Sequence, residues 1–149
     1  MLLLGGGFAS AATAARLRLS VPAHVRRGAA YRIDIRGSFS RRELSGSAFL
    51  ISLIQFAPRA CQATAQRENA WSRRTNTGLQ FYLAPGSDPR RGRIGVFERS
   101  SPFGRSDELK ALSLGSRRVC AYLYPRFISA GAATSPIARA EMTYRVTRK

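Results

Sequence analysis

Two stretches near the start of the chain alternate apolar and polar residues at every second position. In residues 17–21 the odd positions hold leucine or valine, and in residues 31–36 they hold tyrosine or isoleucine. Successive side chains of a β-strand point to opposite faces of its sheet, so this period indicates strands with one apolar and one wet face. Pro22 and Gly37 end the two strands. The chain is therefore expected to fold into sheets that bury one face.

Short apolar runs separated by turn residues continue along the chain. Residues 49–56 are almost entirely apolar, which is typical of a central strand covered on both faces. Residues 60–70, rich in alanine and glutamine, form either a short helix or an irregular crossover. Further strands are expected at residues 79–83, 94–97, 109–114, 118–124 and 142–147, and loops at 97–104 and 129–135.

Seven or eight short strands with turn signals between them predict an all-β fold, an antiparallel immunoglobulin-like sandwich. An up-and-down barrel is the structural alternative. The length of 149 residues suits one domain, and a hydrophobic content of 44% is enough for a packed core. We therefore assign residues 16–149 to a single sandwich domain.

The first fifteen residues have the composition of a cleaved leader. Residues 1–15 carry no charge, contain an apolar stretch from Leu2 to Phe8, and end in small residues that fit the signal-peptidase rule. A basic segment before Leu2 is missing. The run is shorter than the roughly 20 residues that a membrane span needs. We expect a signal-peptide-like leader and a secreted or envelope-located protein; an alanine-rich tail of a cytoplasmic protein is the alternative.

Cys61 and Cys120 are the only cysteines, and an even count in an exported chain argues for a disulfide. Two free buried thiols are one alternative, and a catalytic cysteine paired with His24 is another, although neither neighbourhood resembles a cysteine-hydrolase motif. Two cysteines and one histidine cannot complete a tetrahedral zinc site without acidic ligands. We expect a Cys61–Cys120 bridge, no metal and no other cofactor.

Several short motifs are shared with a known kind of domain. The segments are Leu19-Ser20-Val21-Pro22-Ala23, then Arg27-Gly28, then residues 31–37, and finally Cys120-Ala121-Tyr122-Leu123. With them, residues 17–147 resemble bacterial secreted immunoglobulin-like or fibronectin-like domains, including small exported actinobacterial proteins in which such a Cys-Ala-Tyr-Leu strand is bridged to an earlier cysteine. The resemblance implies an extracytoplasmic sandwich.

Trp71 lies between the two cysteines, as the core tryptophan of antibody-type domains does. However, at least three expected strands precede Cys61, and Arg118 stands where those domains have a tyrosine. We therefore interpret Trp71 as a packing or loop residue.

Residues that could carry catalysis are sparse and scattered. No nucleotide-binding, zinc-protease, serine-hydrolase or calcium-loop motif occurs. The single histidine, His24, is expected to be solvated beside a turn. Asp34 and Glu141 are expected to face outward from strands, and Asp107 and Glu108 to lie in a loop. We expect a non-enzymatic protein, with a hydrolase as an alternative because two distant carboxylates can converge in a cleft.

The chain is strongly basic, with 25 lysines and arginines against 8 acids and a formal net charge of +17. Genomic bias accounts for arginine in place of lysine but not for the shortage of acids. Turn arginines gathered at one end of the sandwich would bind phosphate, sulfate or carboxylate groups, whereas arginines at both ends would only raise solubility. The candidates are Arg26, Arg27, Arg73, Arg74, Arg90, Arg91 and Arg93.

These observations predict a non-catalytic, exported β-sandwich protein that serves as a binding or structural module of the cell surface or envelope. The alternative function is binding of a polyanion by the turn arginines, with an anionic polymer or envelope component as partner. Sequence-specific nucleic-acid binding is not expected, because no RNA-recognition motif accompanies the arginines.

Overall fold

The computed structural model describes residues 14–55, 59–75, 80–81, 95–128 and 134–148, without the side chains at 72, 73, 75, 80, 81 and 95. Nearly all of the expected leader, together with Arg90, Arg91 and Arg93, lies outside the described residues, as does the side chain of Arg73.

One of the two sheets, sheet A, is three-stranded, in the order β1-β3-β7. Its strands are β1 (Arg16–Ser20), β3 (Ala30–Ser38) and β7 (Phe103–Lys110), and both pairings are antiparallel. The alternation found in the sequence decides which face of β3 is buried. Ile33 and Ile35 are almost fully buried, whereas Arg32 and Arg36 on either side of them are exposed.

The other sheet, sheet B, has six strands, with the order β2-β9-β8-β4-β5 and with β6 also paired to β4. The strands are β2 (His24–Arg26), β4 (Ala48–Gln55), β5 (Gln80–Phe81), β6 (Gly95–Glu98), β8 (Gly115–Tyr124) and β9 (Ala138–Thr147). All pairings are antiparallel except that of β2 with β9.

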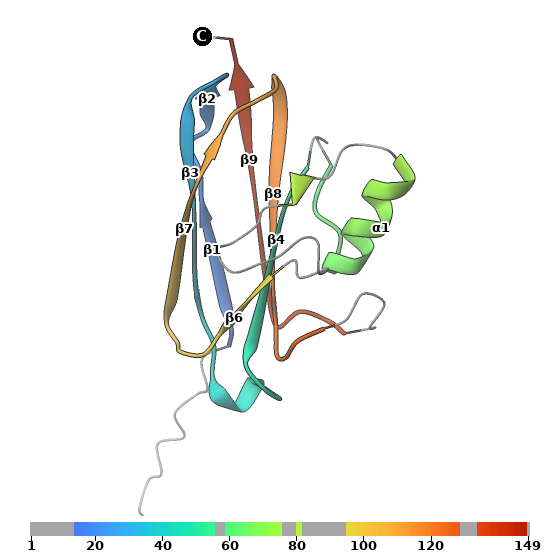
Figure 1. The fold of residues 1–149 in the computed structure, drawn as a ribbon. Helices are drawn as coiled ribbons and strands as arrows, with labels where there is room; N and C mark the ends of the chain where they lie inside the picture. The colour runs from blue at the N-terminus through green and yellow to red at the C-terminus, as the bar shows by residue number, and fades with distance from the viewer. Residues whose placement is uncertain (1–13, 56–58, 76–79, 82–94, 129–133, 149) are drawn as a thin grey trace, which may run out of the picture.

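The sheets face one another, and the helix lies beside the outer side of sheet B (Figure 1). The main core fills the space between the sheets and includes Ile33, Leu50 and Leu123. A second apolar cluster, which includes Leu53 and Tyr122, lies on the other face of sheet B toward α1 (Ala65–Thr75). Every residue of β4 is buried, as expected for a central strand with both faces covered.

The all-β antiparallel sandwich expected from the sequence is confirmed, and the described residues form nine strands, of which β2 and β5 are very short. The run at residues 60–70 contributes to a helix that extends to Thr75 and includes Trp71, which is therefore not a loop residue. The guanidinium of Arg59 lies over the Trp71 ring at 5.6 Å from its centroid. Neither α1 nor the 3-10 turn η1 (Arg41–Glu43), the helices of the described part, is long and apolar enough to cross a membrane.

The strand expected at 109–114 and the loop expected at 97–104 are both wrong in their bounds. Strand β7 begins at Phe103 and ends at Lys110, so Asp107 and Glu108 belong to a strand, and β8 begins at Gly115 rather than after it. Arg105 and Asp107 occupy inward positions of β7, and these charges interrupt the apolar alternation that would reveal the strand. Arg105 is held there by an ion pair with Glu98 of β6.

Gly37 is a point of close contact inside the sandwich. Its register places it between Leu17 of β1 and Phe103 of β7. A Cβ atom on Gly37 would lie 2.4 Å from the Phe103 ring and 2.8 Å from a Leu17 methyl carbon. Glycine is therefore required for the three strands to pack as they do.

Candidate anion-binding site

Of the turn arginines expected to bind polyanions, the structure describes the side chains of Arg26, Arg27 and Arg74, and these lie in two different parts of the molecule. Arg26 ends β2, and the Arg27 N–H donates to the Thr147 carbonyl at 2.8 Å, which places both at the end of the sandwich near the C-terminus (Figure 1). Arg74 lies on α1, beside the outer face of sheet B. The Arg41-Arg42 doublet lies in η1, at the opposite end of the molecule. The predicted gathering of turn arginines at one end of the sandwich stays a prediction, because Arg90, Arg91, Arg93 and the side chain of Arg73 lie outside the described residues.

The doublet Arg117-Arg118 lies within β8 and not in a turn. The Arg117 side chain is only 4% exposed and donates to the carbonyls of Ser113 at 2.7 Å and Leu114 at 3.1 Å. Burial lowers the pKa of this guanidinium. Arg117 therefore stabilises the turn before β8 and does not present its charge to a ligand.

Three other arginines lie together on the outer face of sheet A. Arg18 of β1 stands directly opposite Arg36 of β3, and Arg16 stands opposite Ser38, so that Arg16, Arg18 and Arg36 share one end of this face. We call these three residues the arginine triad. They line a shallow hollow of about 300 Å³, completed by Gly37, Ser38, Pro102 and Phe103.

The guanidinium groups of the arginine triad form no ion pair among the residues that the structure describes. Like charges directly opposite one another on paired strands are destabilising, yet Arg18 and Arg36 are so placed. Within the described part of the chain, no carboxylate forms an ion pair with any of the three, whereas Arg32 on the same face is 3.9 Å from Glu108. The hollow therefore carries an excess of positive charge, with Asp34 on the same face and the Glu43 carboxylate, which accepts from the Ala15 N–H, as nearby acids.

The strand next to the triad leaves room for a ligand. Gly104 of β7 is paired with Arg36, and a Cβ placed on Gly104 would meet no atom within 4 Å. Arg36 is thus flanked by Arg18 on one side and by a position without a side chain on the other. A guanidinium with free donors suits oxyanions such as phosphate, sulfate and carboxylate, which it binds in a bidentate manner.

The alternation in residues 17–21 and 31–36 predicts that Arg18 and Arg36 face outward, but it does not single out the triad. The available signal was arginine repeated at alternate positions of two neighbouring strands. Selecting them requires the register of β1 against β3, because a shift of one residue would move the side chains of one strand to the other face.

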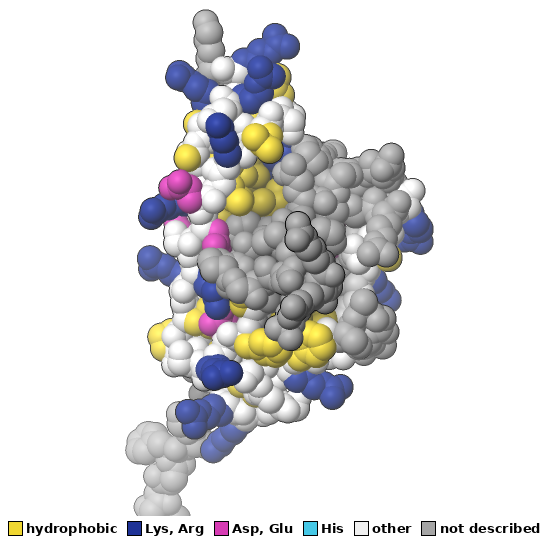
Figure 2. All heavy atoms as spheres, in the orientation of Figure 1, with side chains coloured by type: hydrophobic (Ala, Val, Ile, Leu, Met, Phe, Trp, Pro, Cys, Tyr) yellow, Lys and Arg dark blue, Asp and Glu magenta, His cyan; other side chains and the backbone are white. Residues whose placement is uncertain are grey.

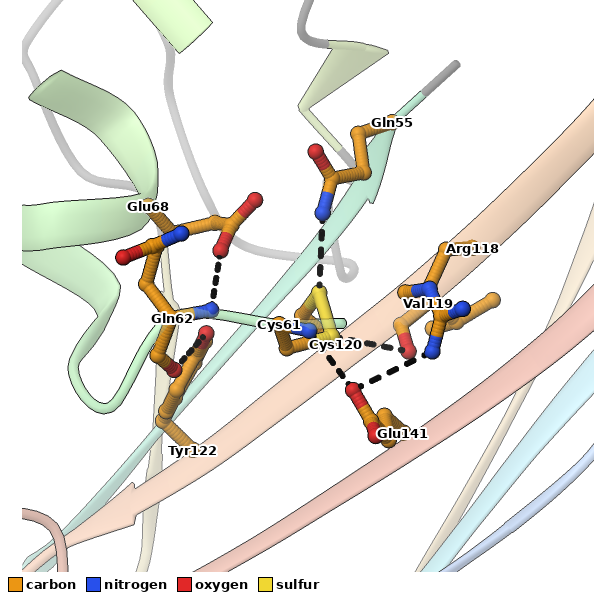
Figure 3. Close-up of a disulfide and its surroundings, with 9 residues drawn as sticks. All are labelled: Gln55, Cys61, Gln62, Glu68, Arg118, Val119, Cys120, Tyr122 and Glu141. Carbon is orange, nitrogen blue, oxygen red and sulfur yellow. Dashed lines mark hydrogen bonds and ion pairs between the residues drawn. A yellow bond between two sulfur atoms is a disulfide. The ribbon is translucent and has the colours of Figure 1, made fainter. Parts of the chain in front are cut away.

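A second polar cluster surrounds the disulfide between Cys61 and Cys120, which forms as expected from the even cysteine count (Figure 3). The backbone N–H groups of Cys61 and Gln62 donate to Glu141 and Glu68, each at 2.6 Å. The Tyr122 hydroxyl donates to the Gln62 carbonyl at 2.8 Å. The cluster fastens the segment before α1 onto sheet B.

Glu68 is a fully buried carboxyl in this cluster. Burial raises its pKa, with the hydrogen bond from Gln62 N–H acting in the opposite direction. Its Oε1 atom and the Oε1 atom of Gln55, which is also fully buried, have no hydrogen-bond partner. The Gln55 side chain and the charge of Arg118 also lower the pKa of Glu68, so burial alone accounts for most of the upward shift.

The arrangement around the disulfide offers little for acid–base chemistry. A hollow of about 110 Å³ is lined by Cys61, Tyr122, Arg139, Ala140 and Glu141, so Glu141 is the one carboxylate among its lining residues. The Glu141 carboxylate is engaged by Arg118 at 3.3 Å. His24 is exposed on β2. Within the described ranges no three His, Cys, Asp or Glu side chains come together as a group that could hold a metal.

Comparisons with known proteins identify no family for this chain. No family model matches it, and no curated protein matches its sequence. Solved structures with a similar arrangement include a CARDB domain from Pyrococcus furiosus, at 8% identity, 91% coverage of this chain, 95% of that one and a TM-score of 0.48.

Two further solved structures are similar at the same distant level. Native alpha-2-macroglobulin from E. coli has 14% identity, 89% coverage of this chain, 10% of that one and a TM-score of 0.49. A superoxide reductase (neelaredoxin) from Ignicoccus hospitalis has 9% identity, 89% and 80% coverage and a TM-score of 0.38. Structural similarity at this level supports no conclusion about the activity of this chain.

Proposed function

We propose that this chain is an exported, non-catalytic β-sandwich module that binds an anionic polymer through the arginine triad. The observation that carries the proposal is the positively charged hollow formed by Arg16, Arg18 and Arg36 on an otherwise regular sheet face. Arginine stays charged at physiological pH, so the site attracts anions under all ordinary conditions.

The geometry of the triad favours a repeating ligand over a single small anion. Residues two apart on a strand are separated by about 6.5 Å, and neighbouring strands by about 4.8 Å. Neighbouring arginines of the triad are therefore about 5–7 Å apart at the backbone, so their long side chains can reach successive anionic groups of one polymer chain. A hollow that is shallow and open suits a polymer that passes over it.

Export is supported by the uncharged leader-like residues 1–15 and by the disulfide. Disulfides persist in oxidising compartments and are rare in a reducing cytosol. Surface or envelope polymers are the anionic polymers that such a protein would meet.

The test compares two variants that remove equal charge from opposite ends of the molecule. The triad variant replaces Arg16, Arg18 and Arg36 with serine, and the control replaces the exposed Arg26, Arg27 and Arg148. Binding to fluorescent heparin is measured over a range of salt. We expect the triad variant to lose on the order of tenfold more affinity than the control, with a weaker dependence on salt.

Two results would contradict the proposal. Equal losses of heparin affinity in both variants would mean that heparin binds through the overall charge of +17 and not at a formed site. Failure of the parent protein to bind heparin at about 100 mM salt would reject polymer binding altogether. Thermal melts of both variants establish that each remains folded.

A further inference from the structure

Three phenylalanine rings form a cluster at one end of the outer face of sheet B. Phe49 of β4 is paired in register with Phe97 of β6, and Phe127 follows the end of β8. The ring centroids are 5.2 Å apart for Phe49 and Phe97, 5.2 Å for Phe49 and Phe127, and 5.9 Å for Phe97 and Phe127. We call these three residues the phenylalanine patch.

The patch is exposed although its base is buried. Phe49 is only 3% exposed, while Phe97 is 47% and Phe127 is 53% exposed. Figure 2 shows hydrophobic side chains gathered in the lower half of one face, with basic side chains below them. Clustered aromatic rings left in water on a folded domain mark a surface that binds something apolar.

Arginines lie close to the patch residues along the chain. Arg99 lies two residues after Phe97, Arg126 immediately precedes Phe127, and both are exposed. Arg99 and Arg41 also line a neighbouring hollow of about 390 Å³. No ion pair to a carboxylate is formed by these three arginines in the portion of the chain that the structure describes.

A backbone hydrogen bond links two of the segments that carry these residues. The Ser45 N–H donates to the Pro125 carbonyl at 3.0 Å, which joins the loop after η1 to the segment that carries Arg126 and Phe127. A partner that fits must therefore be apolar where it meets the rings and anionic around them.

We infer that the phenylalanine patch, with Arg99 and Arg126, docks this protein on the surface of an anionic lipid bilayer. Phenylalanine has no polar group, so the exposed rings suit the boundary between headgroups and acyl chains. The arginines at the edge of the patch extend long side chains whose guanidinium groups bind lipid phosphates.

The alternative of single-stranded nucleic acid is less well matched. Bases bind by stacking on free aromatic faces. Here each ring already packs against the other two, at interplanar angles of 42°, 63° and 36°. The cluster is built as one apolar surface and not as separate stacking platforms.

The test measures co-sedimentation of the full chain with two kinds of vesicle, phosphatidylcholine alone and phosphatidylcholine with about a third phosphatidylglycerol. We expect the chain to bind the anionic vesicles. Replacing Phe97 and Phe127 with serine should weaken this binding on the order of tenfold. The matched control replaces Leu112 and Met142, which are 70% and 38% exposed away from the patch, and should leave binding unchanged.

A second variant tests the basic residues without altering the aromatic cluster. Replacing Arg99 and Arg126 with serine should weaken binding to the anionic vesicles on the order of tenfold, and more than replacing Arg26 and Arg27. It should have little effect on any binding to neutral vesicles. Heparin binding should persist in the phenylalanine variant, which separates this inference from polymer binding by the arginine triad.

The inference would be overturned if the folded chain did not bind anionic vesicles. It would equally be overturned if the phenylalanine variant behaved like the Leu112 and Met142 control. Circular dichroism and thermal melts of each variant show whether it has kept the fold.

Discussion

Removing the Cys61–Cys120 bridge should lower the stability of the domain by a large fraction of its total. The bond joins residues 59 positions apart. The chain-entropy model gives about 4 kcal/mol for a loop of this length. A typical domain has about 5–15 kcal/mol in all. For a domain of this size we expect the melting temperature to fall by about 10–15 °C.

The assay separates the cross-link from the packing of the sulfur atoms. Urea unfolding is measured for the oxidised protein, for the same protein with a phosphine reductant, and for the Cys61→Ala, Cys120→Ala double variant. Reduction removes only the bond. The double variant also removes the buried sulfur of Cys120, to which Gln55 Nε2 donates at 3.5 Å, so it should be slightly less stable than the reduced protein.

Two observations would refute this reasoning. One is an equal free energy of unfolding, within about 1 kcal/mol, for oxidised and reduced protein once thiol titration has shown that reduction is complete. The other is the appearance of two titratable thiols in the denatured, unreduced protein, since the bond would then be absent. Loss of the bond should also raise the urea m-value, because the denatured chain becomes less compact.

The remaining predictions concern single side chains. Ile33→Asp should unfold the domain, because an unpaired buried carboxylate costs several kcal/mol, while Arg32→Ser should change the melting temperature little; equal melts would contradict the strand register. The folded-state pKa of Glu68 is raised above the ordinary 4.5, so the free energy of unfolding should fall as pH rises from about 4.5 until the folded pKa is passed. Glu68→Gln should abolish that fall in urea titrations at several pH values and be more stable than the parent at the upper end; an unchanged pH profile would count against a buried Glu68. Gly37→Ala should destabilise the sandwich by about 1–3 kcal/mol through contact with Phe103, and a neutral effect in thermal melts would show that the ring moves aside.

The sequence alone determined the fold class and those strands in which each face has a uniform environment, either buried or in contact with water. The alternation in β1 and β3 identified both strands, because one face of each is apolar and the other meets water. The continuous apolar run of β4 was recognisable for the opposite reason, since both of its faces are covered. The pairing of Cys61 with Cys120 followed from their number. The leader, the export of the chain and the absence of enzymatic activity stay predictions.

Other features depended on contacts that the apolar–polar alternation does not show. Strand β7 was missed because Arg105 points inward, a position that becomes favourable only when β6 supplies Glu98 as its partner. From the sequence alone Arg117 would be expected on the surface, yet its guanidinium is buried and donates hydrogen bonds to carbonyls of the preceding turn. A polar side chain is stable in a buried position only when it has hydrogen-bond or ion-pair partners, and those partners are known only once the fold is known.

The candidate binding surfaces were decided by tertiary structure in the same way. The sequence shows that arginines are abundant, and it places Arg16, Arg18 and Arg36 on outward faces. Only the antiparallel register of β1 and β3 sets Arg18 opposite Arg36, and only the β4–β6 pairing brings Phe97 onto Phe49. Local periodicity determines which side of a strand a residue occupies, because it is a property of the backbone. Which residues then become neighbours is determined by strand pairing, which depends on the whole sheet.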